Sequence, residues 1–180
     1  MAELKSNRRS ESEKVEDIMV LFFARGEVDS DKFIKICYSH YVGIVSGQGK
    51  KLPKEVEIVR ENGKKPRFLN DVAYFNLSHS HGVVVVGISH TEIGVDIEKV
   101  REIDFEKFKF LEATDEQDFF EKWTEKESWL KLTGEGISKV KCQIPEDAHF
   151  EHFDVFEDYH VCVCAEEQSV FAYEISATEE

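Results

Sequence analysis

The stretch from Trp123 to Lys131 holds the residues best suited to chemistry. It reads Trp-Thr-Glu-Lys-Glu-Ser-Trp-Leu-Lys, contains no Gly or Pro, and is rich in the helix formers Glu, Lys and Leu. On a helix, Trp123, Glu127 and Lys131 recur every four residues and therefore share one face. An aromatic anchor would then stand in line with a carboxylate and an ammonium. On this stretch alone, a surface salt bridge between Glu127 and Lys131 is the simpler explanation.

A second acidic group, in Gly94-Val95-Asp96-Ile97-Glu98, makes a functional interpretation stronger. In a strand, Val95 and Ile97 face one side while Asp96 and Glu98 face the other. Two carboxylates on one strand face repel each other unless a cation or a donor lies between them, although solvation at the end of a strand is the alternative. If the helix bearing Glu127 packs across this strand end, three carboxylates converge. Oxygen ligands without His or Cys favour Mg²⁺, which takes its remaining ligands from water or a phosphate.

Composition limits the class of protein. The chain has 180 residues, 41% hydrophobic and 12% aromatic, which suits one globular domain or two small packed halves. The sequence contains no run of about 18 apolar residues, so we expect no membrane span. The basic N-terminus is not followed by an apolar segment, so we expect no secretory signal. The four cysteines lack metal-ligand spacing, so we expect reduced core residues and a cytoplasmic location.

Charge is distributed unevenly along the chain. The formal net charge is -14, and residues 142–180 hold eleven acidic and no Lys or Arg residues, which argues against nucleic-acid binding. Residues 50–67, in contrast, carry seven Lys or Arg against three Glu. Such a basic patch on an acidic protein suggests a polyanionic small molecule or an acidic partner, and a solvated loop is its alternative.

The hydrophobic pattern predicts an α+β protein. Helices are expected from Asp29 or Ser30 onward and from Thr114, in a capping box with Gln117, to Gly134. A further helical tract is expected from Asp104. Strands are expected over 18–24, 55–61, 75–77, 83–88 and 93–97, and a terminal hairpin is expected to join 161–165 to 170–175.

Four motifs, in this order along the chain, resemble those of the 4'-phosphopantetheinyl transferases of the Sfp type. They are Gly63-Lys64-Lys65-Pro66, Phe75-Asn76-Leu77-Ser78-His79-Ser80, Gly94-Val95-Asp96-Ile97-Glu98 and Trp123-Thr124-Glu125-Lys126-Glu127-Ser128-Trp129-Leu130-Lys131. The resemblance runs from residue 63 to 136. It implies a pseudo-twofold fold of two similar αβ halves with the active site between them. The expected division is a disordered tail over 1–16, an abbreviated N-terminal half over 17–92 and a C-terminal half over 93–180.

The resemblance also implies an activity and its residues. The enzyme would move the 4'-phosphopantetheine group of coenzyme A to a serine of an apo acyl or peptidyl carrier protein, releasing 3',5'-ADP. When the roles of the family's residues are carried over position by position, they imply a metal site and a phosphate site. The resemblance also leads us to expect a monomer. Asp96, Glu98 and Glu127 would hold Mg²⁺, with Glu127 also the general base; Lys131 would stabilise phosphoryl charge; Lys65, Ser78 and His79 would meet the coenzyme A phosphates.

Two alternatives stay open. The chain lacks a clear match to the arginine-rich segments with which larger members of the family grip the adenine and the 3'-phosphate. A catalytically reduced coenzyme A-binding module of the same fold is therefore one alternative. The other is an interaction protein whose acidic C-terminal half docks a basic partner, and that reading requires the three carboxylates to lie apart.

Overall fold

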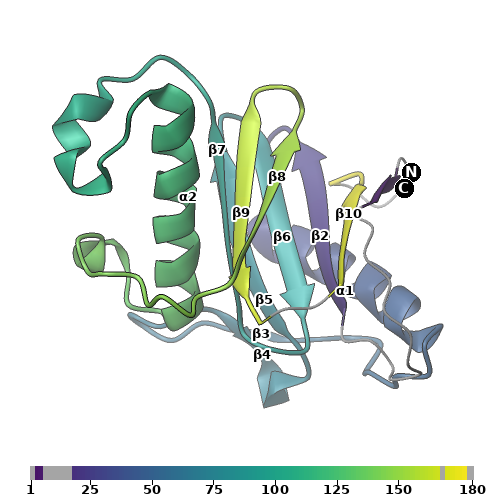
Figure 1. The fold of residues 1–180 in the computed structure, drawn as a ribbon. Helices are drawn as coiled ribbons and strands as arrows, with labels where there is room; N and C mark the ends of the chain where they lie inside the picture. Colours follow the sequence, from purple (N-terminus) through teal and green to yellow (C-terminus); the bar gives the residue numbers. More distant parts are fainter. Residues whose placement is uncertain (1–2, 6–17, 167–168, 178–180) are drawn as a thin grey trace, which may run out of the picture.

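The computed structural model describes residues 3–5, 18–166 and 169–177, which form a mixed α+β fold as the sequence predicts (Figure 1). A first sheet has the order β1-β10-β2-β6-β5 and a second has the order β7-β9-β8. The first comprises β1 (Glu3–Lys5), β10 (Ser169–Glu174), β2 (Ile18–Arg25), β6 (Val83–Ser89) and β5 (Tyr74–Ser80); the second comprises β7 (Ile93–Lys99), β9 (Tyr159–Ala165) and β8 (Phe150–Val155). The remaining elements are α1 (Ser30–Ser46), α2 (Glu116–Thr133), the short pair β3 (Ile58–Val59) and β4 (Arg67–Phe68), and the 3-10 turns η1 (Leu69–Asp71), η2 (Phe105–Leu111) and η3 (Ile137–Lys139).

The two sheets pack face to face between the two helices. Side chains of β2 alternate between two cores: Val20 and Phe22 point toward α1, whereas Leu21 and Phe23 point toward the second sheet. Figure 1 shows α1 and α2 at opposite ends of the molecule, with the strands between them. The resulting order is α1, first sheet, second sheet, α2.

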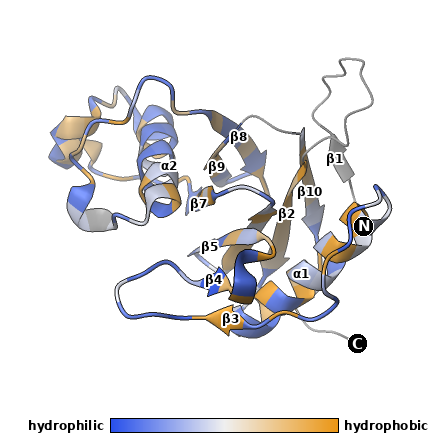
Figure 2. Ribbon diagram, turned by 90° about the horizontal axis from the view of Figure 1, so that it is seen from below, coloured by the Kyte–Doolittle hydropathy of each residue, from blue (hydrophilic) through white to orange (hydrophobic). Residues whose placement is uncertain are grey.

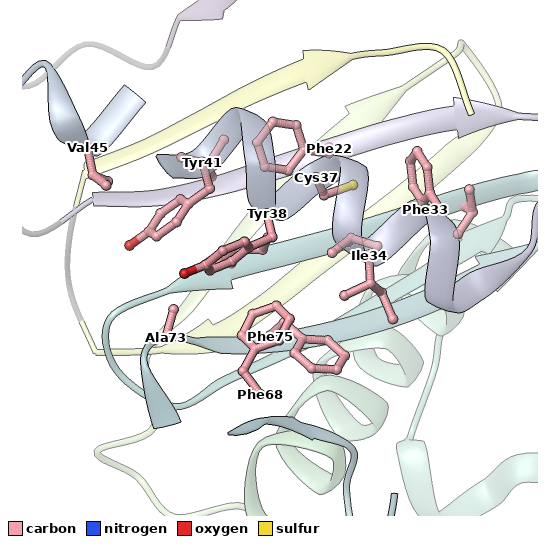
Figure 3. Close-up of a cluster of buried hydrophobic side chains, with 14 of the residues drawn as sticks. Phe22, Phe33, Ile34, Cys37, Tyr38, Tyr41, Val45, Phe68, Ala73 and Phe75 are labelled. Atoms are coloured by element: carbon pink, nitrogen blue, oxygen red, sulfur yellow. The ribbon is translucent and has the colours of Figure 1, made fainter. Parts of the chain in front are cut away.

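Helix α1 is held by an amphipathic face. Asp29 caps its first turn, because the carboxylate accepts a hydrogen bond of 2.9 Å from the backbone N–H of Lys32. Figure 2 shows polar and apolar residues interleaved along the helix, and Figure 3 shows its buried face, with Cys37 and Tyr38, packed against Phe22 and Phe75. This core fixes the position of β5.

Helix α2 covers the outer face of the second sheet. It ends at Gly134 as predicted, with φ 72° at this C-cap. Its cap is Asp115, which accepts from the N–H of Asp118, so the prediction of a Thr114 cap with Gln117 is wrong. The backbone N–H and the hydroxyl of Thr114 both donate to the Asp118 carboxylate. A carboxylate is a stronger acceptor than a hydroxyl, so Thr114 acts here as a donor and not as the acceptor of a capping bond.

The predicted terminal hairpin is also wrong. Strand β9 pairs with β7 on one side and β8 on the other, so neither of its edges is open to β10. Strand β10 instead crosses to the first sheet, where it pairs parallel to β2 and antiparallel to β1. Strand β10 therefore lies inside the first sheet, between β1 and β2.

Other predictions meet the structure only in part. The tail expected over 1–16 lies outside the described residues except for Glu3–Lys5, which form β1. The strand expected over 55–61 is reduced to Ile58–Val59, and the helical tract from Asp104 is the 3-10 turn η2, kinked at Phe108. In the described part of the chain, the helices lack the length and apolar composition that a membrane span needs.

Candidate active site

The site lies where β5 meets β7, and side chains of β5 join the two strands. Every second residue of β5 accepts a hydrogen bond from a β7 backbone N–H. The pairs are Asn76 Oδ1 with Val95 N at 2.9 Å, Ser78 Oγ with Ile97 N at 3.4 Å and Ser80 Oγ with Lys99 N at 3.2 Å. These bonds stitch the first sheet to the second and keep buried backbone N–H groups paired.

Gly94 allows α2 to lie directly against β7. A Cβ atom at this position would stand 1.9 Å from the Ser128 carbonyl oxygen and 2.5 Å from the Leu132 nitrogen, both in the backbone of the helix. Contacts this short do not occur, so a side chain at position 94 would push the helix away. The glycine of the Gly-Val-Asp-Ile-Glu motif thus has a packing role, and it brings Lys131 within reach of Asp96.

Three polar side chains from three elements meet at this contact. The Lys131 ammonium donates to Asp96 Oδ1 at 2.6 Å and to Ser78 Oγ at 2.8 Å, while the Ser78 hydroxyl donates to the same Asp96 oxygen at 2.8 Å. The Asp96 side chain is only 5% exposed, and its second oxygen, Oδ2, is buried and has no hydrogen-bond partner within residues 3–5, 18–166 and 169–177. Next along β7, Glu98 accepts from the Ser80 hydroxyl at 2.9 Å. The arrangement leaves one buried carboxylate oxygen to be satisfied by a cation or donor.

The electrostatics join Glu127 to these groups. Burial raises the pKa of Glu127, and the negative charges of Asp96 and Glu98 raise it further against the opposing effect of Lys131. Burial likewise raises the pKa of Asp96, although Lys131 and Ser78 act in the opposite direction, and it raises the pKa of Glu98, with Asp96 adding to the effect. Burial therefore raises the pKa of all three carboxylates in spite of nearby positive charge, which comes from Lys131 for Asp96 and Glu127 and from Arg101 for Glu98.

This cluster fits a hard divalent cation by its donor chemistry. Asp96, Glu98 and Glu127, the predicted magnesium ligands, do not bring three ligand atoms within 4.8 Å of one another. Among the described residues, a different group meets that spacing, namely Glu121, Glu125 and His152. Magnesium usually keeps several waters and needs only one or two protein carboxylates. Asp96 Oδ2 is an oxygen donor of this kind, and burial and mutual repulsion couple the Glu98 and Glu127 carboxylates to the same place.

Lys65 and His79, two of the predicted phosphate ligands, lie apart from this cluster. The Lys65 ammonium donates to Glu92 Oε2 at 2.8 Å and to the Ile93 carbonyl at 2.6 Å, about 10 Å from Asp96 along β7. Since strand residues alternate, the exposed His79 points to the opposite face of β5 from Ser78. There it lines a hollow of about 400 Å³ beside the start of α1, together with Glu27, Ser30 and neighbouring backbone.

The basic stretch over 50–67 is a surface loop around the short pair β3–β4. Several of its cations form local ion pairs: Lys64 with Glu61 at 2.6 Å, Arg60 with Asp31, and Arg67 with Asp71 at 3.3 Å. Lys64 and Arg67 lower the pKa of Glu61. These exposed pairs agree with the solvated-loop alternative.

Sequence reasoning missed several residues of the site. Asn76 and Ser80 belong to the motif over 75–80, but the resemblance implied no function for them. Their two-residue spacing from Ser78 nevertheless places all three on one polar face of the strand. Trp123, on the same helix face as Glu127, serves in packing: its ring stacks on Phe119, with the centroids 6.0 Å apart, and lies edge-on to Phe108 at 5.7 Å.

A fixed ammonium and partly buried carboxylates are groups of the kind that phosphoryl transfer uses. Sequence comparison relates the chain to one class of enzyme. The chain is similar to 4'-phosphopantetheinyl transferases, as the four motifs predict. It is 33% identical over 99 residues to the 4'-phosphopantetheinyl transferase gsp of Aneurinibacillus migulanus, covering 48% of this chain and 42% of that protein. It is 34% identical over 102 residues to psf-1 of Bacillus pumilus, covering 48% and 44%.

A further relative is the 4'-phosphopantetheinyl transferase Sfp of Bacillus subtilis, 28% identical over 123 residues, with 52% of this chain and 55% of that protein covered. The chain thus spans about half the length of the curated relatives it matches. No protein-family profile matches it.

Proposed function

We propose that the chain is a Mg²⁺-dependent 4'-phosphopantetheinyl transferase. Its co-substrates would be coenzyme A and an apo acyl or peptidyl carrier protein, and its second product 3',5'-ADP. The observation that carries the proposal is the cluster of Asp96, Ser78 and Lys131, with the unpartnered oxygen of Asp96 at its centre. Similarity to 4'-phosphopantetheinyl transferases over about half of the chain supports the same reaction.

The reaction breaks a phosphoanhydride bond of the coenzyme A diphosphate and forms a phosphate ester on the serine. The serine oxygen of the carrier protein attacks the phosphorus attached to the pantetheine arm, and the bond from that phosphorus to the bridging oxygen of the diphosphate breaks. The 3',5'-ADP leaves with that oxygen. The serine proton must go to a base, and Glu127 accepts it, directly or through water.

Glu127 and Lys131 have environments suited to these roles. Because burial and the neighbouring carboxylates raise its pKa, Glu127 binds a proton more readily than an exposed glutamate does. Lys131 has three N–H donors, of which Asp96 and Ser78 occupy two. The third can donate to a phosphoryl oxygen, and the two fixed bonds hold the ammonium in place for it.

Asp96 would bind Mg²⁺ through Oδ2, and Glu98 and Glu127 would reach the ion through its waters or after side-chain rotation, since the three carboxylates do not yet stand within 4.8 Å of one another. The charge of the ion would offset that of the diphosphate. Asp96 Oδ2 is the protein atom that most needs such a partner. His79 is suited to a phosphate of coenzyme A in the hollow beside α1, where a helix N-terminus favours anions. Lys65 would add a second positive charge at the other end of the site. One chain supplies all of these residues, so the active form would be a monomer. The reducing cytoplasm suits its free cysteines, Cys37, Cys142, Cys162 and Cys164.

Intact-protein mass spectrometry tests the proposal. An apo carrier protein incubated with this chain, coenzyme A and Mg²⁺ should gain the mass of one phosphopantetheine group. Glu127→Gln should remove the gain, and Glu116→Gln on the same helix should retain it. A folded wild-type protein that modifies none of a panel of acyl and peptidyl carrier proteins would contradict the assignment.

The second candidate is a coenzyme A-binding module without catalysis, favoured by coverage of only 42% to 55% of the relatives' length. Calorimetry separates the two. Binding of coenzyme A by the wild-type chain without any mass gain on carrier proteins would favour the module, and both together would favour the transferase.

A further inference from the structure

A second group of ligand-bearing side chains lies on the outer face of the second sheet, where α2 passes β8. Glu121 and Glu125 stand one helical turn apart on α2, and His152 faces them from β8. One ligand atom from each lies within 4.8 Å of the other two. His152 Nε2 is 3.2 Å from Glu125 Oε1. Two ligands bound tetrahedrally at about 2.0–2.2 Å stand roughly 3.3–3.5 Å apart, so small side-chain rotations would suffice to hold an ion.

The other ring nitrogen of His152 is already held in the way that metal-binding histidines usually are. Its Nδ1 lies 3.1 Å from Nε2 of His160, and His160 Nδ1 lies 2.9 Å from Asp154 Oδ1. Since a carboxylate accepts, we assign the His160 proton to Nδ1, which makes His160 Nε2 the acceptor for His152 Nδ1–H. This chain directs the Nε2 atom of His152 at the two glutamates, and such outer partners fix ligand orientation.

The cluster is buried on the side of His160, which holds it rigid, and open to solvent on the side of Glu121. His160 is 5% exposed, and the side chains of Glu125 and His152 are 30% and 29% exposed. Glu121 is exposed, so an ion can enter from solvent and keep water ligands in its open positions. One imidazole and two carboxylates suit a first-row transition dication better than Mg²⁺, which prefers oxygen alone.

We propose that Glu121, Glu125 and His152 form a metal site for a first-row transition dication such as Zn²⁺, separate from the transfer site. The ion takes the place of the proton on His152 Nε2 and links α2 to the edge strand β8. Its role is to fix the helix that carries Glu127 and Lys131. This metal site is independent of the proposed transferase activity.

Calorimetric titration with ZnSO₄ tests the site, after removal of bound metal by a chelator and in excess Mg²⁺ so that the Asp96 cluster does not compete. Wild type should bind one Zn²⁺, and its melting temperature should rise with the ion concentration. His152→Gln, and the double change Glu121→Gln with Glu125→Gln, should abolish that binding. Asp154→Asn, which alters only the outer partner, should weaken it by about 10–100-fold.

Matched controls make the outcome decisive. His40→Gln, an exposed histidine of α1, and Glu116→Gln on α2 should bind Zn²⁺ as the wild type does. Circular dichroism establishes that each variant is folded. If a variant is not, Zn²⁺ added to the wild-type protein must shift the ring NMR signals of His152. Unaltered binding in folded His152→Gln, equal competition by Mg²⁺, or no Zn²⁺ binding by the wild type would overturn the proposal.

Discussion

Replacing Gly94 with Ala tests how the fold positions the site. The added Cβ would lie 1.9 Å from the Ser128 carbonyl oxygen, whereas ordinary contact begins near 3.4 Å. The clashing atoms, the Ser128 oxygen and the Leu132 nitrogen, both belong to the backbone of α2, so no side-chain rotation relieves the clash. Helix α2 must therefore move away from β7 by about 1.5 Å, the difference between 3.4 Å and 1.9 Å. The Lys131–Asp96 bond of 2.6 Å would lengthen beyond hydrogen-bond range.

The cost has two parts. Overpacking of this kind lowers the free energy of unfolding by about 1–3 kcal/mol, and for a chain of this size each kcal/mol lowers the melting temperature by about 2–4 °C. The rate of phosphopantetheine transfer should fall more sharply than the free energy of unfolding, since a displacement of about 1 Å among catalytic residues can lower a rate by about 100-fold. Thermal unfolding and carrier-protein modification, both measured on the same preparation, would provide the two quantities.

Gly43→Ala is the matched control. Gly43 lies on the exposed face of α1, and a Cβ there meets nothing within 4 Å. The change should raise stability by up to about 1 kcal/mol through helix propensity and leave transfer unaltered. If Gly94→Ala has the stability and activity of wild type, the close approach of α2 to β7 is not what positions Lys131.

Three further predictions follow from the same contacts. Lys131→Met should abolish transfer and lower stability, because the Asp96 carboxylate would lose its ammonium partner while staying buried; wild-type activity would refute the role of Lys131, and Lys139→Met is the control. Asn76→Ala should cost about 1–3 kcal/mol in denaturant unfolding, since it leaves the Val95 N–H buried without an acceptor; an unchanged midpoint would show that water replaces the amide. Without added metal, the hydrogen bond to Glu125 raises the pKa of His152, so its contribution to stability is complete below the unfolded pKa of about 6.5 and is lost as pH rises through the folded value. His152→Gln should therefore reduce the decline in melting temperature over that interval, and an identical profile in wild type and variant would contradict the shift.

Local sequence signals predicted the start of α1 and the end of α2, but they placed the N-cap of α2 one residue too early, at Thr114 instead of Asp115. Asp29 caps α1 and Gly134 ends α2, because capping depends on the few residues at a helix end. The pairing of β10 could not be predicted in the same way. Its partner depends on which strand edges are free, and the occupation of both edges of β9 is a property of the whole fold.

The site shows the same division. The motifs indicated Asp96, Ser78 and Lys131, and the structure brings these three together. The sequence did not reveal that Asp96 Oδ2 is left without a partner, because that depends on packing around a buried atom. The group of Glu121, Glu125 and His152 escaped notice since His152 lies far along the chain on β8, although the four-residue spacing of the glutamates was visible.

The most direct test of the central claim is a crystal structure with coenzyme A and Mn²⁺ in place of Mg²⁺, in which anomalous scattering locates the ion. We expect an anomalous peak within coordination distance of Asp96 Oδ2, close to Glu98 and Glu127, with the coenzyme A diphosphate completing its ligands. Bound coenzyme A whose diphosphate lies away from Asp96, with no ion on that oxygen, would contradict the proposed transfer site.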